Sequence, residues 1–524
     1  MGTTCQKFVL SSVVVTLVSV LLNCGGPASV QPLQSTSVTT AAITTTQNPL
    51  VAQFAYVSAT QASVAVEFGT DTTYGRQTSA QTTPAGGGQV SILVAGMKPA
   101  TTYHMRAVLT YPNGSQAVSA DQTFTTGSVP ANRLSQVAVS GSSERPASGG
   151  VELLDLFSGS ATQFRAEALD LDGSLIWYYD FPISNDEMPF PIKPLANGHF
   201  LITITPQTQN GKGVGGTLRE IDLAGNTIRQ ITIDQLNARL SSGGFNVVAT
   251  SMHHDVIALP NGHWVVLVDD ERPFTMLQGY EGQTINVMGD DIVDLDGNLN
   301  PVWVWSAFDH LDVNRHPMYF PPDWTHANAV IYSPDDGNLL LSMRHQHWVI
   351  KIDYQDGKGA GDIIWRLGYQ GDFTIDTGNP ADWYYGQHAP IFLGSNTTNV
   401  FDLALFDNGN NRVLDQNGTI CGASGAPACY SRAAIFEISE ATKVVHILWE
   451  DKPLEFSQAV GDNIELTNGD MEFDMGALGT NPFNAQVTEV THEAVPQIVW
   501  QMNITGQGAY RAFRIPSLYP GVQW

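Results

Sequence analysis

The segment VDLDGNLNPVWVW, residues 293–305, joins an acidic residue and a glycine turn to an apolar run that carries tryptophan. Short runs of strand-forming residues flank the turn, which is typical of two antiparallel strands. The same unit recurs at residues 169–179, 220–231, 351–367, 437–450 and 489–501. A repeat of this kind indicates that the chain stacks copies of one small β unit.

A second strand–turn–strand unit precedes these copies. It occurs at residues 194–203 (PLANGHFLIT), 259–268, 333–342 and 466–473, and more loosely at 393–405. Two hairpins per repeat give a four-stranded sheet, which cannot cover both of its faces alone. Radial packing around an axis covers the faces and leaves few open edges. The sequence therefore predicts an all-β protein with a six-bladed β-propeller over residues 150–524; a large sandwich or a β-helix is the alternative.

Length and composition agree with this architecture. A chain of 524 residues is too long for one compact core, so several domains or one large repeat domain are expected. The 49 glycines, the 28 prolines and a charged content of only 14% suit many strands joined by turns. The formal net charge of −26 argues against a nucleic-acid partner, because phosphate binding needs clustered lysine and arginine.

Residues 49–128 show a different pattern, in which short alternating runs are separated by turn clusters such as TPAGGG. This pattern predicts a small β-sandwich. Residues 93–109 resemble the fibronectin type III signature, with Tyr103 in its corner position. We expect this domain to act as a spacer or as the contact of a homodimer.

The first residues read as an export signal. Lys7 is followed by the apolar run Phe8–Leu22, and residues 21–25 (LLNCG) resemble a bacterial lipobox in which Cys24 is lipidated. An ordinary secretory signal is the alternative for residues 1–24. Residues 25–48 are rich in serine and threonine and are expected to form a flexible linker. The predicted location is the periplasm or cell envelope, with membrane contact only through the N-terminal lipid.

Two cysteines remain beyond the signal, Cys421 and Cys429, and they flank the turn-rich loop GASGAPA. An oxidising compartment would pair them as a disulfide. A metal site is the alternative, although no histidine is adjacent to either cysteine.

Three histidine-containing segments occupy equivalent places in successive repeats, each before a turn: residues 252–255 (MHHD), 325–328 (THAN) and 386–390 (GQHAP). The first strand of a propeller blade lines the central channel, so equivalent positions in three blades point toward one axis. Because side chains alternate along a strand, only one of His253 and His254 can face the channel. Alignment of residues 253–255 with 326–328 favours His253.

Five segments in order resemble the bacterial arylsulfate sulfotransferases, the arylsulfotransferase family, over most of residues 151–524. They are residues 252–262 (MHHDVIALPNG), 323–353 (DWTHANAVIY with LLLSMRHQHWVIKID), 386–394 (GQHAPIFLG), 406–412 (FDNGNNR) and 429–438 (CYSRAAIFEI). The resemblance implies ping-pong transfer of a sulfuryl group from a phenolic sulfate donor to a phenolic acceptor through a sulfohistidine. The resemblance also implies that the reaction uses no nucleotide sulfate donor and no cofactor.

The resemblance also implies the roles of individual residues. His388 corresponds to the nucleophile. The sulfuryl group is surrounded by His326, Arg344 and either His253 or His254, and Asn328 lies close by. The family's disulfide corresponds to Cys421 and Cys429.

The residue types suit this chemistry. A neutral imidazole is a good nucleophile near pH 7, and Arg344 offers a fixed fork of donors to sulfuryl oxygens. A second histidine can serve as general acid and then as base; we assign His326, with His253 as the reserve. Four aromatic residues are candidates for holding the aryl rings, with plain packing as the alternative: Tyr319, Phe320, Trp324 and Tyr384.

Two other functions compete with this hypothesis. His253, His326 and His388 could ligate zinc or copper at the axis, but the positive charge of Arg344 in the same pocket argues against a metal ion. The other is a non-catalytic binding propeller at the cell surface.

Overall fold

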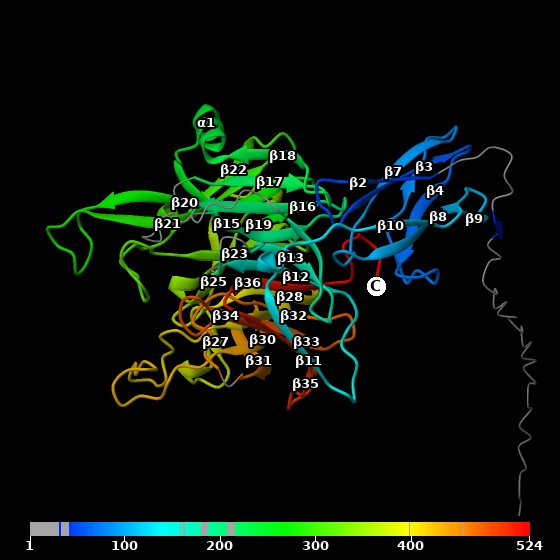
Figure 1. Ribbon diagram of the computed structural model, residues 1–524. Helices are drawn as coiled ribbons and strands as arrows, with labels where there is room; N and C mark the ends of the chain where they lie inside the picture. The colour runs from blue at the N-terminus through cyan, green and yellow to red at the C-terminus, as the bar shows by residue number, and fades with distance from the viewer. Residues whose placement is uncertain are drawn as a thin grey trace, which may run out of the picture.

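The structure is a computed structural model that describes residues 31–32, 41–157, 159–160, 163–179, 187–206, 215–397, 399–453 and 455–524. The predicted export signal, Cys24 and most of the predicted linker lie outside these residues, so they stay predictions. Among the described residues, no helix has both the length and the apolar character needed to cross a membrane. The described chain consists almost entirely of antiparallel sheets (Figure 1).

The described part of the chain forms a propeller of six sheets, which we number as blades 1–6, naming the innermost strand of each blade first. Blade 1 contains β36 (Gly508–Ile515), β12 (Val151–Phe157), β13 (Ala166–Leu169) and β14 (Leu175–Tyr179). Blade 2 contains β15 (Glu187–Pro194), β16 (Phe200–Pro206), β17 (Thr217–Ile221) and β18 (Thr227–Thr232). Blade 3 contains β19 (Ala249–Ala258), β20 (Trp264–Phe274), β21 (Ile285–Leu295) and β22 (Pro301–Ser306).

The remaining blades follow in the same order. Blade 4 contains β23 (Ala327–Ser333), β24 (Asn338–Met343), β25 (Trp348–Ile352) and β26 (Ile363–Gly368). Blade 5 contains β28 (His388–Thr397), β29 (Val400–Asp407), β30 (Arg432–Ser439), β31 (Val444–Asp451) and the short edge strand β27 (Thr374–Ile375). Blade 6 contains β32 (Asn463–Glu465), β33 (Met471–Leu478), β34 (Asn484–Val490), β35 (Ile498–Thr505) and β11 (Gln136–Gly141). The helices α1 (Ile233–Gly243) and α2 (Ala307–His310) follow blades 2 and 3.

The repeat found in the sequence is the hairpin that joins the third and fourth strands of each blade, counted from the axis. In residues 293–305 the Asp296 carboxylate accepts the backbone N–H groups of Asn298 and Asn300, both at 2.8 Å, and so closes the turn between β21 and β22. The second repeated unit joins the two inner strands of blades 2 to 6. Blade 1 lacks a copy because its inner pair, β36 and β12, comes from opposite ends of the propeller.

The tryptophan of the repeat has a structural role, because its indole N–H reaches the next blade. Five of these bonds follow the ring: Trp177 to Leu223 O, Trp305 to Gly361 O, Trp365 to the Glu440 carboxylate, Trp449 to Glu493 O and Trp500 to Leu171 O. In blade 2 an arginine replaces the tryptophan, and Arg229 donates to Gly297 O. Apolar clusters fill the spaces between neighbouring blades.

A β-sandwich lies beside the propeller (blue, at the right of Figure 1). One sheet contains β2 (Ala42–Thr45), β3 (Ala52–Ser58) and β7 (Gly88–Val94). The other contains β1 (Gln31–Pro32), β9 (Gln116–Val118), β8 (Thr102–Thr110), β4 (Ser63–Gly69) and β5 (Arg76–Gln77), with β10 (Gln122–Thr125) on β8 and β6 (Gln81–Thr82) on β4. The Tyr103 hydroxyl accepts the Lys98 N–H at 2.9 Å, as expected for the corner tyrosine of such a domain.

Two boundaries differ from those expected. β1 and β2 lie within residues 25–48, which were expected to be linker, and β11 joins blade 6 ahead of residue 150. The sandwich is tied to the propeller by an ion pair of 2.5 Å between Arg76 and Asp170. The chain end also contacts the sandwich, because the Tyr519 hydroxyl accepts the Ala95 N–H at 2.6 Å.

Candidate active site

The three histidine segments lie on the inner strands of blades 3, 4 and 5, in the middle of β19 and at the start of β23 and β28, and each strand is bulged there. Strand pairing is interrupted between His253 and Val256, between Ala327 and Ala329, and between His388 and Ile391. A non-glycine residue with positive φ accompanies each bulge: His254 (51°), His326 (49°) and Ala389 (45°). Bulges re-aim side chains, and left-handed backbone at non-glycine residues is concentrated at functional sites.

These bulges bring three imidazoles to one cavity of about 360 Å³. His254, His326 and His388 line it, and the ring centroids of His254 and His326 are 4.7 Å apart. The expected convergence of three blades is therefore found. The preference for His253 is wrong, because His254 is the member of that pair that lines the cavity. The bulge interrupts the regular alternation on which the alignment relied.

His388 is held in one orientation by Asn408. The Asn408 amide donates to Ser457 O and Val460 O, both at 3.0 Å, so its oxygen faces the His388 Nδ1 atom at 2.6 Å. Nδ1 must then carry the proton, which leaves a lone pair on Nε2. Burial, followed by the charge of Arg344, holds the pKa of His388 well below its usual value. His388 is therefore a neutral imidazole with an unprotonated Nε2, which in this structure accepts the Val460 N–H at 3.3 Å and must exchange that contact for a substrate before it can attack.

Buried ion pairs hold the turn that carries Asn408. The Asp407 carboxylate accepts from Arg412 at 2.7 Å and from Arg432 at 2.8 Å. Cys421 and Cys429 form the expected disulfide, so the metal alternative for these cysteines is wrong. The Sγ atom of Cys421 lies 3.5 Å from Gly409 O, directly beside the same turn.

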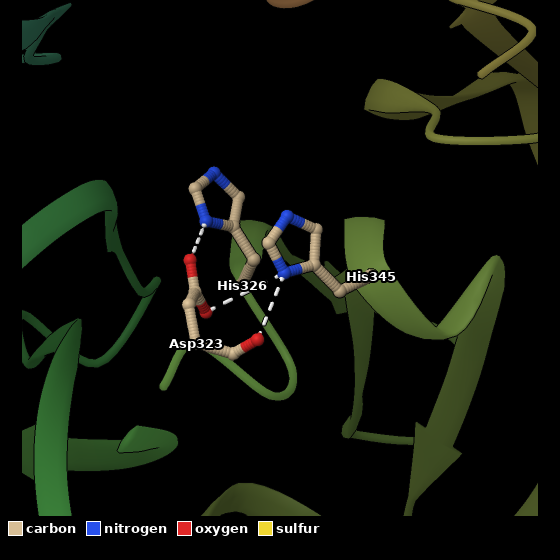
Figure 2. Close-up of side chains that lie close together, drawn as sticks. All are labelled: Asp323, His326 and His345. Atoms are coloured by element: carbon tan, nitrogen blue, oxygen red, sulfur yellow. Dashed lines mark hydrogen bonds and ion pairs between the residues drawn. The ribbon is translucent and has the colours of Figure 1, made fainter. Parts of the chain in front are cut away.

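His326 is oriented by Asp323, as Figure 2 shows. The Asp323 Oδ2 atom lies 2.5 Å from His326 Nδ1. The ring of His345 stacks on His326, with centroids 4.5 Å apart, and its Nδ1 lies 3.2 Å from Asp323 O. Burial and the neighbouring His326 lower the pKa of His345 to about 3, so His345 is neutral. Burial alone would raise the pKa of Asp323, but the adjacent histidines hold it well below its usual range.

Arg344 and Asn328 lie close to the cavity without being among its lining residues in the described chain. Arg344 is buried; its Nη2 donates to Gln458 O at 3.0 Å and its Nη1 lies 3.3 Å from His345 Nε2. Asn328 is fully buried, and its amide donates to Gln387 O at 2.7 Å. Arg344 therefore supplies positive charge beside His388, whereas Asn328 ties the inner strands of blades 4 and 5 together.

Aromatic residues other than those expected line the cavity. They come from blades 1, 2 and 6 and their loops: Phe157, Phe190, Phe483 and Tyr510. Phe190 and Tyr510 stack with centroids 4.4 Å apart. Trp324 and Tyr384 are instead fully buried packing residues, Phe320 packs against Tyr280, and Tyr319 is exposed with Arg344 over its ring.

The three-histidine metal hypothesis requires the ligand atoms of His253, His326 and His388 to lie close together. Among the described residues, two groups of side chains have possible ligand atoms within 4.8 Å of one another: Asp323, His326 and His345, and His253, Asp269 and Asp290. Neither group is the expected set. The guanidinium of Arg344 beside His345 also opposes a cation at the first group.

Fold and cavity together define a six-bladed propeller with a pocket of basic and aromatic side chains at its axis. The arylsulfotransferase (ASST) family model matches residues 145–511, which is most of the chain. The protein therefore belongs to the arylsulfotransferase family and is a sulfuryl-transferring enzyme. No curated protein matches the sequence.

Proposed function

We propose that this enzyme moves a sulfuryl group from a phenolic sulfate ester to a phenolic acceptor through a covalent sulfohistidine on His388. The observation that carries the proposal is the hydrogen bond between His388 Nδ1 and Asn408, which leaves Nε2 unprotonated at the cavity. A covalent intermediate divides one difficult transfer into two easier ones.

In the first half-reaction, the lone pair of His388 Nε2 attacks the sulfur atom. The bond between sulfur and the phenolic oxygen breaks, and the phenolate leaves with that electron pair. Protonated His326 gives its Nε2 proton to this oxygen, while its Nδ1 stays bonded to Asp323. In the second half-reaction, neutral His326 takes the proton of the incoming phenol. The phenol oxygen then attacks sulfur, and the sulfur–nitrogen bond breaks to restore His388.

The surroundings suit an anionic aryl ester. Arg344 places a guanidinium beside His388, and the charge of Arg511 also acts on the same imidazole. Local positive charge of this kind can draw a sulfate ester into a protein whose net charge is −26. Phe190 and Tyr510 offer aromatic faces for the ring of the donor or the acceptor.

The direct test is to trap the intermediate. The enzyme is mixed with p-nitrophenyl sulfate without an acceptor, digested, and searched by mass spectrometry for a sulfuryl adduct on the peptide that carries His388. We expect the adduct to appear with a burst of p-nitrophenol and to disappear when phenol is added. His388→Ala should lose both signals, whereas His446→Gln, at an exposed histidine paired with Asp376, should keep them. Transfer without an adduct on His388 would overturn the proposal.

We also propose that the enzyme works in the cell envelope, because a disulfide persists in an oxidising compartment. Fractionation of cells that express the full chain and its Cys24→Ala variant tests the lipid anchor. Release of only the variant from membranes is expected, and equal release of both would contradict the anchor.

A further inference from the structure

His253 lies directly behind His254 and is buried away from the cavity, with only 3% of its surface exposed. Its Nδ1 atom lies 2.8 Å from His254 Nδ1. Its Nε2 atom lies 3.2 Å from a carboxylate oxygen of Asp269 and 3.2 Å from one of Asp290. His253 thus connects two carboxylates on β20 and β21 to a histidine that lines the cavity.

Both carboxylates have fixed places in the fold. Asp290 accepts the Ala327 N–H at 2.7 Å and the Thr325 hydroxyl, so it joins blade 3 to the start of β23. Asp269 accepts the Ser251 hydroxyl. Within the described residues His253 Nε2 makes no well-aligned hydrogen bond, but it faces two carboxylate oxygens at 3.2 Å that cannot turn away without losing these bonds. A lone pair on Nε2 would be repelled by both negative charges, so Nε2 bears a proton.

The proton between His253 and His254 can then be assigned to one of the two rings. Two nitrogens 2.8 Å apart share one proton, and it belongs either to His253 or to His254. An imidazole beside two carboxylates is stabilised as the doubly protonated cation, so His253 keeps this proton and donates it. His254, whose pKa burial and the charge of His326 lower well below the usual value, is neutral and accepts on Nδ1. Its own proton must then sit on Nε2.

We infer that His253 is a positioning residue which, with Asp269 and Asp290, fixes His254 as a neutral donor that presents Nε2–H to the cavity. Nε2 lies on the ring edge opposite the His253 contact, and the ring lines the cavity beside His326. On the proposed function, this N–H meets an oxygen of the sulfuryl group. The opposite tautomer would instead present a lone pair, which repels that oxygen.

The arrangement also predicts an alkaline limit to activity. The groups that face His253 are His254 on its own strand, Asp269 on β20, Asp290 on β21 and Asp323 before β23. Burial opposes the charge on His253, but Asp269 and Asp290 prevail and raise its pKa to about 9. Above that pH His253 loses a proton, and the direction of the hydrogen bond to His254 is no longer fixed.

The first test needs no substrate. Protein labelled with ¹⁵N-histidine is examined near pH 7, and His254 is assigned from the spectrum of His254→Gln. We expect an unprotonated Nδ1 and a protonated Nε2 on His254, and two protonated nitrogens on His253. A proton on His254 Nδ1 would overturn the inference, even if the sulfohistidine is confirmed. A missing sulfohistidine with the expected spectrum would refute the proposed function and leave the tautomer assignment standing.

The second test uses kinetics of the first half-reaction, measured as the burst of p-nitrophenol without an acceptor. His253→Asn retains an amide N–H for His254 but cannot titrate, so it should keep most of the burst rate constant and lose the decline near pH 9. His253→Leu removes the donor and should lower the burst rate constant about 10²-fold, the usual effect of losing one oriented donor. His446→Gln, at a surface His–Asp pair, should retain the wild-type pH profile. A decline that persists in His253→Asn, or full activity in His253→Leu, would refute the role of His253.

Discussion

Substitution of Asn408 by aspartate should move the acidic limb of activity. In the enzyme, Asn408 Oδ1 lies 2.6 Å from His388 Nδ1, and both side chains are buried. A carboxylate at this place would stabilise the imidazolium, and an opposite charge this close raises a histidine pKa by about 1–3 units. The folded-state pKa of His388 starts well below its usual value, so the raised value should appear as a shift of the acidic limb of kcat/KM to higher pH. The plateau above the limb should remain, because the imidazole is neutral there.

The assay is the pH dependence of kcat/KM for p-nitrophenyl sulfate, since this parameter reports groups of the free enzyme. Asn463→Asp is the matched control, because Asn463 is also fully buried and its amide also donates to backbone carbonyls, Leu405 O and Ala434 O. Both variants place a carboxylate against carbonyl oxygens and should lose about 1–3 kcal/mol of stability. Only Asn408→Asp should shift the limb. An unmoved limb in a folded variant would refute the argument that Asn408 controls the protonation of His388.

Four further outcomes follow from the site. Arg344→Gln should lower kcat/KM about 10²–10³-fold, and Arg344→Lys should recover part of the loss, because the charge returns without the planar fork. Equal activity of the two variants would contradict a role for the charge, and wild-type activity of Arg344→Lys would contradict a role for the fork. Asp323→Asn should make the rate more sensitive to the basicity of the leaving phenol, because His326 loses the carboxylate that stabilises its charged form. The measurement is the slope of log kcat/KM against the pKa of the leaving phenol for a series of substituted phenyl sulfates. An unchanged slope would exclude His326 as the acid. Replacing Cys421 and Cys429 together by serine should reduce the free energy of unfolding in urea by about 2–3 kcal/mol, the chain-entropy value for a short loop of separation 8. Dialysis against EDTA should leave kcat unchanged, whereas activity that is lost and then restored by zinc would favour the metal hypothesis.

The propeller was accessible from the sequence because its information is local. Each hairpin can be recognised in the sequence by a turn such as Asp296–Asn300 and by the tryptophan that follows it. The same reasoning did not predict how the two ends of the propeller join, because β11 and β36 pair with strands several hundred residues away. No local pattern distinguishes a strand that completes its own hairpin from one that completes a distant blade.

The site was accessible in outline for the same reason. His326 and His388 stand at equivalent points of the repeat, and the structure brings them to one cavity. The choice between His253 and His254 depended on strand alternation, which a bulge overrides. The role of Asn408 could not be predicted, because it lies in a segment rich in turn-forming residues. Its hydrogen bond to His388 joins residues 20 positions apart, which no local pattern indicates. The lining aromatics come from blades without a histidine motif, so no spacing pointed to them.

The closure of the ring by β36 has a consequence for biosynthesis. This strand carries Tyr510 and Arg511, and the Arg511 guanidinium reaches Asn328 O and the Asp255 carboxylate across the axis. Hairpins of the middle blades can form as soon as their own strands are available, since their contacts are local. The pocket wall that Tyr510 supplies can be added only after translation is nearly complete. A nascent or prematurely terminated chain should therefore remain inactive even when most of its sheets have formed.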